Sequence, residues 1–462
     1  MICACIDAKV DYLDFADAAD FVFGVSQFDK QAKAAGIFAL SGVSSFPVLT
    51  AAVLRHMAKD MDIVKVQGGI APSPYAGIGL NVMRAVVGYA GAPVKLLRDG
   101  AQSHGVGLAE SMRYTIAVPG RLPLNNIHFS LVDVPDLQVI PPDHPKMTDI
   151  WMGAGPVPEI LHRILNLLAK ARSTLRLPSL VPFSRLFYIV LNTMKFGEHR
   201  GGMFVRAEGL SDGRSVEHSW HLLAEADDGP YIPSMAIEAI IRKLLDGQRP
   251  AIGARPGTHA LELADYDTLF AGRSIFTGFR QDQTNAPLYQ RILGTAFDTL
   301  PSTVKALHAS EKERRWSGRA QVIRGDGLLA KIVCALIGFP KSADSVAVTV
   351  SLTPDTDGEV WTRDFGGRRF RSVQSCGTGR NQYLLVERFG IIAVSLALVV
   401  EDDRLFLRPR RWSLLGLPLP NFLLPAGNSF EAEVDGCFRF NVEIRAPVVG
   451  LIVAYQGQLS ED

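Results

Sequence analysis

The sequence predicts two kinds of fold in one chain: an incomplete α/β doubly wound domain with an α+β insert, followed by an antiparallel β-rich domain. Three observations support this prediction. Short apolar strands alternate with helices over residues 1–61, strands and helices mix without regular order over residues 62–231, and hairpin turns separate short strands after Leu300. With 462 residues, the chain is also long enough for two or three domains.

The beginning of the chain has the repeating unit of a doubly wound sheet. Residues 10–15 and 37–40 suit short parallel strands, and apolar residues recur at helical spacing between Asp20 and Ala35. The loop Ser41-Gly42-Val43-Ser44-Ser45-Phe46-Pro47 then leads into a helix through Lys59, because a serine followed by an early proline is a typical helix start. The pattern predicts strand, small-residue loop and helix in turn.

Polar residues follow both of these strands. Asp14 ends the first strand, and Ser44 and Ser45 follow the second together with Gly42. Open α/β sheets bind ligands at the carboxyl ends of their strands, so these residues are candidate ligand contacts. An aspartate in such a loop is also a common turn or cap residue.

Residues 62–231 predict the α+β insert. The expected strands are 62–70, 93–98, 113–118, 126–133, 202–208 and 215–225, and the expected helices lie near 76–90, 156–171 and 183–196. The last two strands flank Leu210-Ser211-Asp212-Gly213, which is a hairpin signal. A helix from Met235 to Leu245 follows, and residues 263–300 are expected to be a linker.

Three turns organise the C-terminal residues 301–462. Gly366-Gly367, Asp402-Asp403 and Asp435-Gly436 each separate two alternating runs, which predicts an antiparallel meander that forms a curled sheet or a barrel. Only residues 328–338 have a helical pattern there. The preceding Gly325-Asp326-Gly327-Leu328-Leu329-Ala330 satisfies a dinucleotide-binding pattern, but hairpins rather than further βαβ units follow it, so we interpret it as a plain turn.

Two further motifs lie in the insert. Residues 209–213 spell G-x-S-x-G, yet a strand follows the serine, so the pattern indicates a hairpin and not a nucleophile elbow. His218 and His221 are three positions apart on one strand and therefore point to opposite faces, which excludes joint metal binding. The strand that carries these histidines can have a structural role alone. The alternative is that the face of His218 and Trp220 forms a site, where an imidazole could act as acid or base.

Composition restricts the class of protein. Lys+Arg 48 against Asp+Glu 47 gives a net charge of +1 without a basic cluster, so no nucleic-acid partner is expected. The five cysteines have no framework spacing and indicate free thiols in the cytoplasm. Residues 180–196 are too short for a membrane span and contain Arg185; we expect a core helix, with contact to a membrane surface as the alternative.

Two segments carry a family resemblance. Residues 4–14, ACIDAKVDYLD, resemble the A-C-I-x-A-G-V-x-Y-x-D stretch of saccharopine-dehydrogenase-like reductases, and the Ser41–Pro47 loop follows as in that family. Residues 221–233, HLLAEADDGPYIP, resemble the return from the substrate domain to the cofactor domain. The match covers roughly residues 1–262. Residues from about 290 onward resemble a bacterial domain of unknown function, through GRAQVIRGDGLLAKIVCALIGFP, EVWTRDFGGRRFRS, GLPLPNFLLP and GLIVAYQGQL.

The resemblance implies an NAD(P)-dependent oxidoreductase. A partial Rossmann-like cofactor domain would span residues 1–61 and 232–262, and the substrate domain residues 62–231. Asp14, Gly42, Ser44 and Ser45 would line the nicotinamide side of NADP or NAD, and His218 and Tyr231 would contact a small-molecule substrate. Family members begin with a glycine-rich turn that holds the pyrophosphate. That turn is absent here and Lys9 stands where glycine is usual, so the chain is expected to be truncated at its N-terminus.

Other functions stay open beside this hypothesis. A non-catalytic protein could hold a hydrophobic ligand within the C-terminal sheet, as the apolar residues 391–400 and 414–424 suggest. A defective gene product would expose the unpaired edge of half a sheet. A homodimer is a further expectation.

Overall fold

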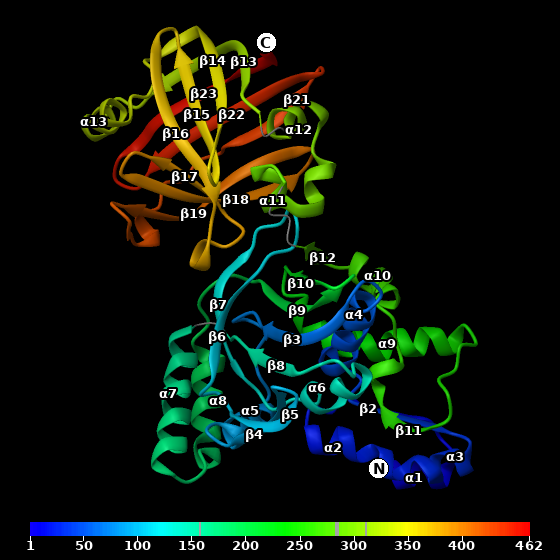
Figure 1. Cartoon of the computed structure of the whole chain (residues 1–462). Helices are drawn as coiled ribbons and strands as arrows, with labels where there is room; N and C mark the ends of the chain where they lie inside the picture. Colours follow the sequence, from blue (N-terminus) through cyan, green and yellow to red (C-terminus); the bar gives the residue numbers. More distant parts are fainter. Residues whose placement is uncertain (157–158, 282–285, 310–311) are drawn as a thin grey trace. The chain divides into compact units, whose positions relative to one another are not determined.

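The computed structural model describes residues 1–156, 159–281, 286–309 and 312–462. The chain divides into two compact units (Figure 1). Unit 1 comprises Met1–Ile116 and Ile127–Phe279, and unit 2 comprises Ala117–Asn126 and Arg280–Asp462. The fold class predicted from the sequence is confirmed: an α/β part, an α+β part and an antiparallel barrel are all present.

The α/β part of unit 1 is a parallel sheet with strand order β1-β2-β11. The strands are β1 (Tyr12–Leu13), β2 (Phe38–Ser41) and β11 (Gly253–Pro256). Five helices accompany them: α1 (Ile2–Ala8), α2 (Ala19–Gly24), α3 (Asp29–Ala35), α4 (Thr50–Met57) and α9 (Ile232–Leu245). The single helix expected over residues 20–35 is broken at Gly24 into α2, a 3-10 turn and α3, because glycine is a poor helix former.

The α+β part of unit 1 is built on a mixed sheet with strand order β12-β10-β9-β3-β8-β7-β6. Its strands are β3 (Asp62–Ala71), β6 (Ser111–Ile116), β7 (Leu124–Leu131), β8 (Asp149–Ala154), β9 (Gly201–Ser211), β10 (Arg214–Ala224) and β12 (Ile275–Gln281). The β9–β10 hairpin is confirmed, with Asp212 and Gly213 both at positive φ. Strand β8 was not predicted from the sequence, because polar and apolar residues do not alternate regularly along Asp149–Ala154.

Several smaller elements complete unit 1. They are the hairpin β4 (Pro93–Arg98) with β5 (Ala101–Val106), and the helices α5 (Leu80–Tyr89), α6 (Asp136–Val139), α7 (Glu159–Leu175), α8 (Ser184–Thr193) and α10 (Ala264–Ala271). Helices α5, α7 and α8 share a small core of their own, while α4 and α9 pack into the main core. No helix in the described ranges is both long and apolar enough to cross a membrane.

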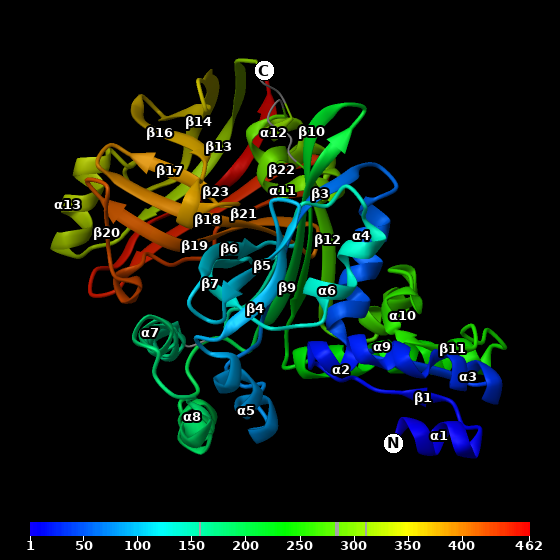
Figure 2. The same cartoon turned by 60° about the horizontal axis from the view of Figure 1, so that its bottom comes forward.

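Unit 2 contains a closed antiparallel barrel (Figure 2). Its strands are β13 (Arg314–Arg324), β14 (Ala343–Asp355), β15 (Gly358–Phe365), β16 (Arg368–Cys376), β17 (Leu385–Phe389), β18 (Ile392–Glu401), β19 (Arg404–Leu414), β21 (Phe430–Val434), β22 (Cys437–Ala446) and β23 (Gly450–Glu461). Pairing of β18 with β19 and of β13 with β23 closes the ring. The short β20 (Leu417–Pro418) extends β19.

The hairpin turns of the barrel lie between strands whose side chains alternate, as a closed antiparallel sheet requires. All three predicted hairpins are present, and the residues at each turn, such as Asp402 and Asp403, have positive φ as a type I′ turn requires. The pairing of β19 with β21 is short, joining only Arg404–Phe406 to Phe430–Ala432. The helix α13 (Leu328–Ile337) connects β13 to β14, while α11 (Leu288–Leu293) and α12 (Ser302–His308) lie on the opposite side of the barrel in both views (Figures 1 and 2).

Candidate functional site

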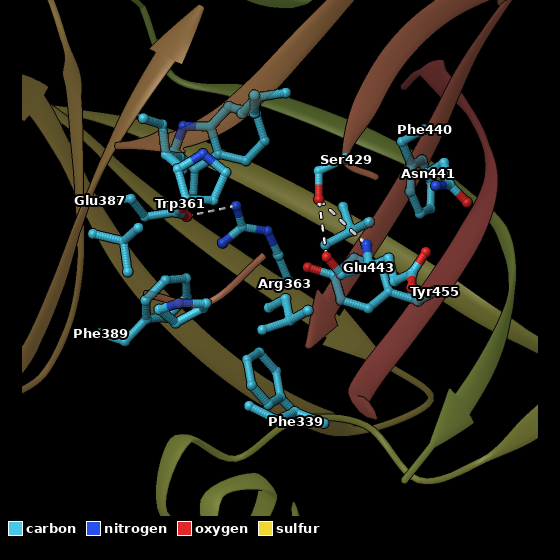
Figure 3. Close-up of a pocket in the computed structure, with 18 of the residues that line it drawn as sticks. Phe339, Trp361, Arg363, Glu387, Phe389, Ser429, Phe440, Asn441, Glu443 and Tyr455 are labelled. Carbon is cyan, nitrogen blue, oxygen red and sulfur yellow. Dashed lines mark hydrogen bonds and ion pairs between the residues drawn. The ribbon is translucent and has the colours of Figure 1, made fainter. Parts of the chain in front are cut away.

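The barrel of unit 2 encloses a cavity of about 310 Å³, which lies at the lower end of the range for small-molecule sites, ~300–1,000 Å³. Inward-facing residues of nearly every strand line it, and most of them are apolar or aromatic (Figure 3). On β15, the inward positions are Trp361, Arg363 and Phe365. Alternation along each strand therefore produces an apolar cavity that contains few polar groups.

Arg363 is the central polar group of the cavity (Figure 3). Its Nη2 donates to Glu387 Oε1 at 3.0 Å, and its Nη1 donates to Ser372 Oγ at 2.8 Å. The Ser372 hydroxyl in turn donates to the same Glu387 oxygen at 2.7 Å. Both charged side chains are only 11% exposed. Burial alone would lower the pKa of Arg363, but the Glu387 carboxylate more than offsets this effect and holds the pKa above its usual value.

Aromatic rings hold the guanidinium of Arg363 in place. Its Cζ lies 4.8 Å from the ring centroid of Trp361 and 5.4 Å from that of Phe370. Tyr455 also lines the cavity, and burial raises the pKa of its hydroxyl to about 12, so this phenol stays neutral. The cation is thus surrounded by π faces and one carboxylate instead of water.

A second set of polar groups lies next to α11 and α12. Tyr289 donates from its hydroxyl to Gln374 Oε1 at 3.0 Å, and its ring stacks on His308 at 3.6 Å. His308 Nε2 lies 2.6 Å from Glu431 Oε2. Tyr289, Gln374 and Glu431 all line the cavity. This end of the cavity is therefore polar and hydrogen-bonded.

The opposite end of the cavity is mostly apolar, with Glu443 of β22 as a charged lining residue. Val333 and Ile337 of α13 line it together with Phe339, which follows the helix. Ile392 and Val449 lie at strand ends near the same rim. The gradient from polar groups at α11 and α12 to apolar groups at α13 suits an elongated molecule with one polar end.

The charged side chains that line the cavity, Arg363, Glu387, Glu431 and Glu443, all have partners. Arg363 pairs with Glu387, Glu431 lies against His308, and Glu443 pairs with Arg445. A ligand with a full negative charge would compete with Glu387 for Arg363 in a region that water cannot easily solvate. The cavity is consequently better matched to an uncharged polar group that accepts or donates hydrogen bonds.

Sequence reasoning missed Arg363 and Glu387. The available signal was the run Glu359-Val360-Trp361-Thr362-Arg363-Asp364-Phe365, in which Arg363 stands two positions from each of two large aromatic residues. Alternation places all three side chains on the same face of the strand. Pairing with the other strands decides whether this face of β15 points into the barrel or away from it.

The structure brings together part of the predicted strand-end site in unit 1. Asp14 Oδ1 accepts hydrogen bonds from Ala16 N, Ser41 Oγ and Gly42 N, each at 2.9 Å. Gly42 has φ of 70°, and a Cβ there would lie 2.8 Å from a methyl group of Val22. Asp14 and Gly42 therefore tie the two loops to each other.

The serines of this loop differ in accessibility. Ser45 is buried and Ser44 is half-buried. In the part of the chain that the structure describes, no strand of the parallel sheet β1-β2-β11 leads through a glycine-rich turn into a helix. The contact of Asp14, Gly42, Ser44 and Ser45 with a nicotinamide ring stays a prediction, because Asp14 Oδ1 already accepts hydrogen bonds from the chain itself.

His218 and Tyr231 lie on elements other than this loop, on β10 and in the turn before α9. His218 lies on β10 opposite Ala207, on the face that includes the buried Trp220, whereas His221 is on the other face, as predicted. Tyr231 is 51% exposed and stacks under Arg273 at 4.2 Å. Within the described residues, no hydrogen bond joins His218 or Tyr231 to Asp14 or Gly42, and no group of side chains could hold a metal ion.

A charged pocket of about 300 Å³ lies on the mixed sheet of unit 1. Arg206 is fixed there by two bonds of 2.7 Å to Glu217 and one of 2.7 Å to Gln67. Arg98, which pairs with Glu110 at 2.8 Å, lines the same pocket. The pocket lies within residues 62–231, where the substrate domain was expected.

One family model matches the region of the barrel. Residues 300–459 match the model of a domain of unknown function (DUF4166), in agreement with the resemblance of the C-terminal sequence to such a domain. No curated protein matches the chain. Among solved structures, the chain is similar to apo histidine-tagged saccharopine dehydrogenase (L-Glu forming) from Saccharomyces cerevisiae, with 10% identity, a TM-score of 0.42, and coverage of 61% of this chain and 82% of that chain.

Proposed function

We propose that the barrel of unit 2 binds an elongated apolar molecule that carries one uncharged polar group, such as a hydroxyl or a carbonyl. The cavity of about 310 Å³ with its single central ion pair carries this proposal. The polar group would lie near Arg363 and Gln374, and the apolar part would extend toward α13. Burial of the apolar part provides affinity, at roughly 25 cal/mol per Å² of area removed from water.

A fluorescent polyene fatty acid and the corresponding alcohol test this function in the intact chain. Both probes brighten when they leave water, and Trp361 and Trp412 in the lining provide an energy-transfer signal. We expect the alcohol to bind more tightly than the acid at neutral pH, because the alcohol does not compete with Glu387. Tighter binding of the acid contradicts the neutral ligand, and no signal from either probe contradicts binding.

A variant that fills the cavity gives the matched control. Val394 lines the cavity, and Val394→Phe reduces its volume, so the probe signal should decrease. Val434 is 44% exposed at the β21–β22 turn, and Val434→Phe should leave binding unchanged. Circular dichroism of both variants separates loss of the cavity from loss of the fold.

A second function is proposed for unit 1: hydride transfer between NADPH or NADH and a small polar substrate. Its support is the convergence of Asp14, Ser41 and Gly42 at the carboxyl ends of β1 and β2, together with the sequence resemblance of residues 1–262. The substrate would occupy the pocket of Arg206 and Arg98. The free cysteines support a reducing compartment such as the cytoplasm.

Titration of NADPH and NADH against the chain tests this second function. We expect the nicotinamide fluorescence to rise on binding and Asp14→Ala to weaken it. Absence of binding by either dinucleotide contradicts the oxidoreductase function and leaves the ligand-binding function of unit 2 unaffected.

A further inference from the structure

Helix α7 carries apolar side chains on its exposed face as well as on its buried face. The face that packs on unit 1 contains Leu165 and Ala169 together with His162 and Asn166, and the Asn166 amide donates to Leu108 O at 2.7 Å and to Ser130 Oγ at 2.9 Å. The opposite face is apolar: Ile160, Ile164, Leu167, Leu168 and Leu175 are 65%, 47%, 68%, 38% and 68% exposed. A surface helix of a globular protein normally buries its apolar stripe and exposes polar residues.

Helix α8 and the segment before it continue this pattern. Phe183, Leu186 and Ile189 are each more than half exposed, while Phe187, Tyr188 and Leu191 pack against the core shared with α5 and α7. The three helices therefore form one helical layer of unit 1 (Figures 1 and 2). We define the outer apolar surface as Ile160, Ile164, Leu167, Leu168, Leu175, Phe183, Leu186 and Ile189. Eight exposed apolar side chains on one helical layer mark a candidate interaction site.

The charges around the outer apolar surface have one sign. Residues 159–196 contain six cations and one acid, Glu159. The cations are Arg163, Lys170, Arg172, Arg176, Arg185 and Lys195. Glu159 is already paired with Arg113 and Arg163. On a helical wheel, Arg163 and Lys170 flank the apolar stripe on one side, as in helices that lie in a lipid interface. Arg172 lies on the other side, where its guanidinium donates to the carbonyls of Gly88 and Ala90.

We propose that the outer apolar surface of α7 and α8 docks on an anionic lipid bilayer, with both helices lying in the interface. The apolar side chains would enter the boundary of the acyl chains, and the flanking cations would contact acidic head groups. A second copy of the chain is the poorer occupant, because a two-fold interface would bring the same cations against each other. The proposal is independent of the ligand-binding and reductase functions.

Cosedimentation with vesicles tests the proposal on the full chain. Vesicles of phosphatidylcholine alone are compared with vesicles of phosphatidylcholine and phosphatidylglycerol in equal parts. We expect binding to the anionic vesicles only, weakening as salt is added. Leu167→Gln with Leu186→Gln should abolish binding, and Lys170→Glu with Arg185→Glu should reduce the affinity by about tenfold or more. All four residues are exposed, so the fold should be retained.

Matched substitutions elsewhere in unit 1 are the controls. Leu245 is 82% exposed at the end of α9, and Lys30 is exposed on α3, so Leu245→Gln and Lys30→Glu should leave binding unchanged. The proposal is overturned if the chain sediments with neither kind of vesicle, or if the control and surface variants bind alike. A dimer that dissociates on Leu167→Gln, without vesicle binding, would overturn it in favour of a second copy.

Discussion

Arg363 and Glu387 form a 3.0 Å ion pair inside the barrel of unit 2, and both side chains are 11% exposed. Neither charge can be removed without leaving the other uncompensated in a region of low dielectric. In the proposed ligand-binding function, the pair would therefore determine which ligand charge the cavity accepts, and a single isosteric substitution changes it.

Glu387→Gln should reverse the charge preference of the cavity. The substitution leaves Arg363 without its counter-charge, so a fatty acid should bind at least about tenfold more tightly than to the parent chain, since a nearby opposite charge contributes several kcal/mol at low dielectric. Affinity for the alcohol should change little. Equilibrium fluorescence titration with both probes measures the two affinities.

Two further variants make this result interpretable. Glu401 pairs with Arg408 on the β18–β19 hairpin, and Glu401→Gln should leave both affinities unchanged. The double variant Arg363→Met with Glu387→Met removes both charges and should not gain affinity for the acid. If Glu387→Gln and this double variant behave alike while both are folded, the ion pair does not control ligand charge.

The stability of unit 1 should depend on the ionisation of Asp136. This residue is fully buried, and burial raises the pKa of its carboxyl group from 3.8 to about 7, although the nearby Thr50 hydroxyl opposes the shift. Between these two values the folded chain keeps a proton that the unfolded chain has lost. The free energy of unfolding should therefore fall as pH rises through this window, by up to about 1.4 kcal/mol per pH unit, and level off above it.

Asp136→Asn removes this dependence because an amide does not titrate. Urea unfolding of the parent and the variant at a series of pH values should give profiles that converge near pH 4 and separate toward pH 8, with the variant the more stable at the higher pH. Parallel profiles would show that Asp136 is not protonated in the folded chain.

Gly42→Ala should destabilise unit 1 by about 1–3 kcal/mol, because the new Cβ meets Val22 at 2.8 Å and the backbone has φ of 70°. Gly36 has φ of 72°, but no atom lies within 4 Å of the position that a Cβ would take there, so Gly36→Ala isolates the backbone contribution. Adding Val22→Ala to Gly42→Ala should recover part of the loss in urea unfolding. Equal losses for Gly36→Ala and Gly42→Ala would exclude the contact with Val22.

Asp14→Ala should lower the free energy of unfolding by about 2–4 kcal/mol, because Oδ1 accepts three hydrogen bonds from Ala16, Ser41 and Gly42. Asp14→Asn retains an oxygen acceptor and should cost less. Asp17 is exposed three positions later, so Asp17→Ala is the control in the same denaturation series. Similar stabilities of the Asp14→Ala and Asp17→Ala variants would contradict the structural role of this carboxylate.

The sequence predicted those parts of the fold that depend on residues close together in the chain, such as hairpin turns. The Asp402-Asp403 and Asp435-Gly436 turns identify their hairpins because positive φ at both central positions selects such residues. Closure of the barrel depends on the pairing of Ser317 with Ser460, across most of the C-terminal half of the chain, and no short segment encodes that pairing. The sequence alone therefore did not show which face of each strand points into the barrel.

The same reasoning applies to the candidate sites. The convergence of Asp14 with Gly42 follows from the rule that parallel strands end at one edge, and the structure has this contact. The pairing of Arg363 with Glu387 joins β15 to β17 across an intervening strand, which alternation alone does not predict. The role of His218 and Tyr231 in substrate binding stays a prediction.

The short pairing of β19 with β21 has a consequence for how a molecule could enter the barrel. The backbone pairing ends with the hydrogen bond from Leu407 N to Ser429 O at 3.0 Å, and Pro409 and Pro425, which lack an N–H group, line the cavity beyond it. Past that bond, the gap between the two strands can widen without breaking ladder hydrogen bonds. The contents of the cavity could then exchange through this one gap while the other strands of the barrel keep their register.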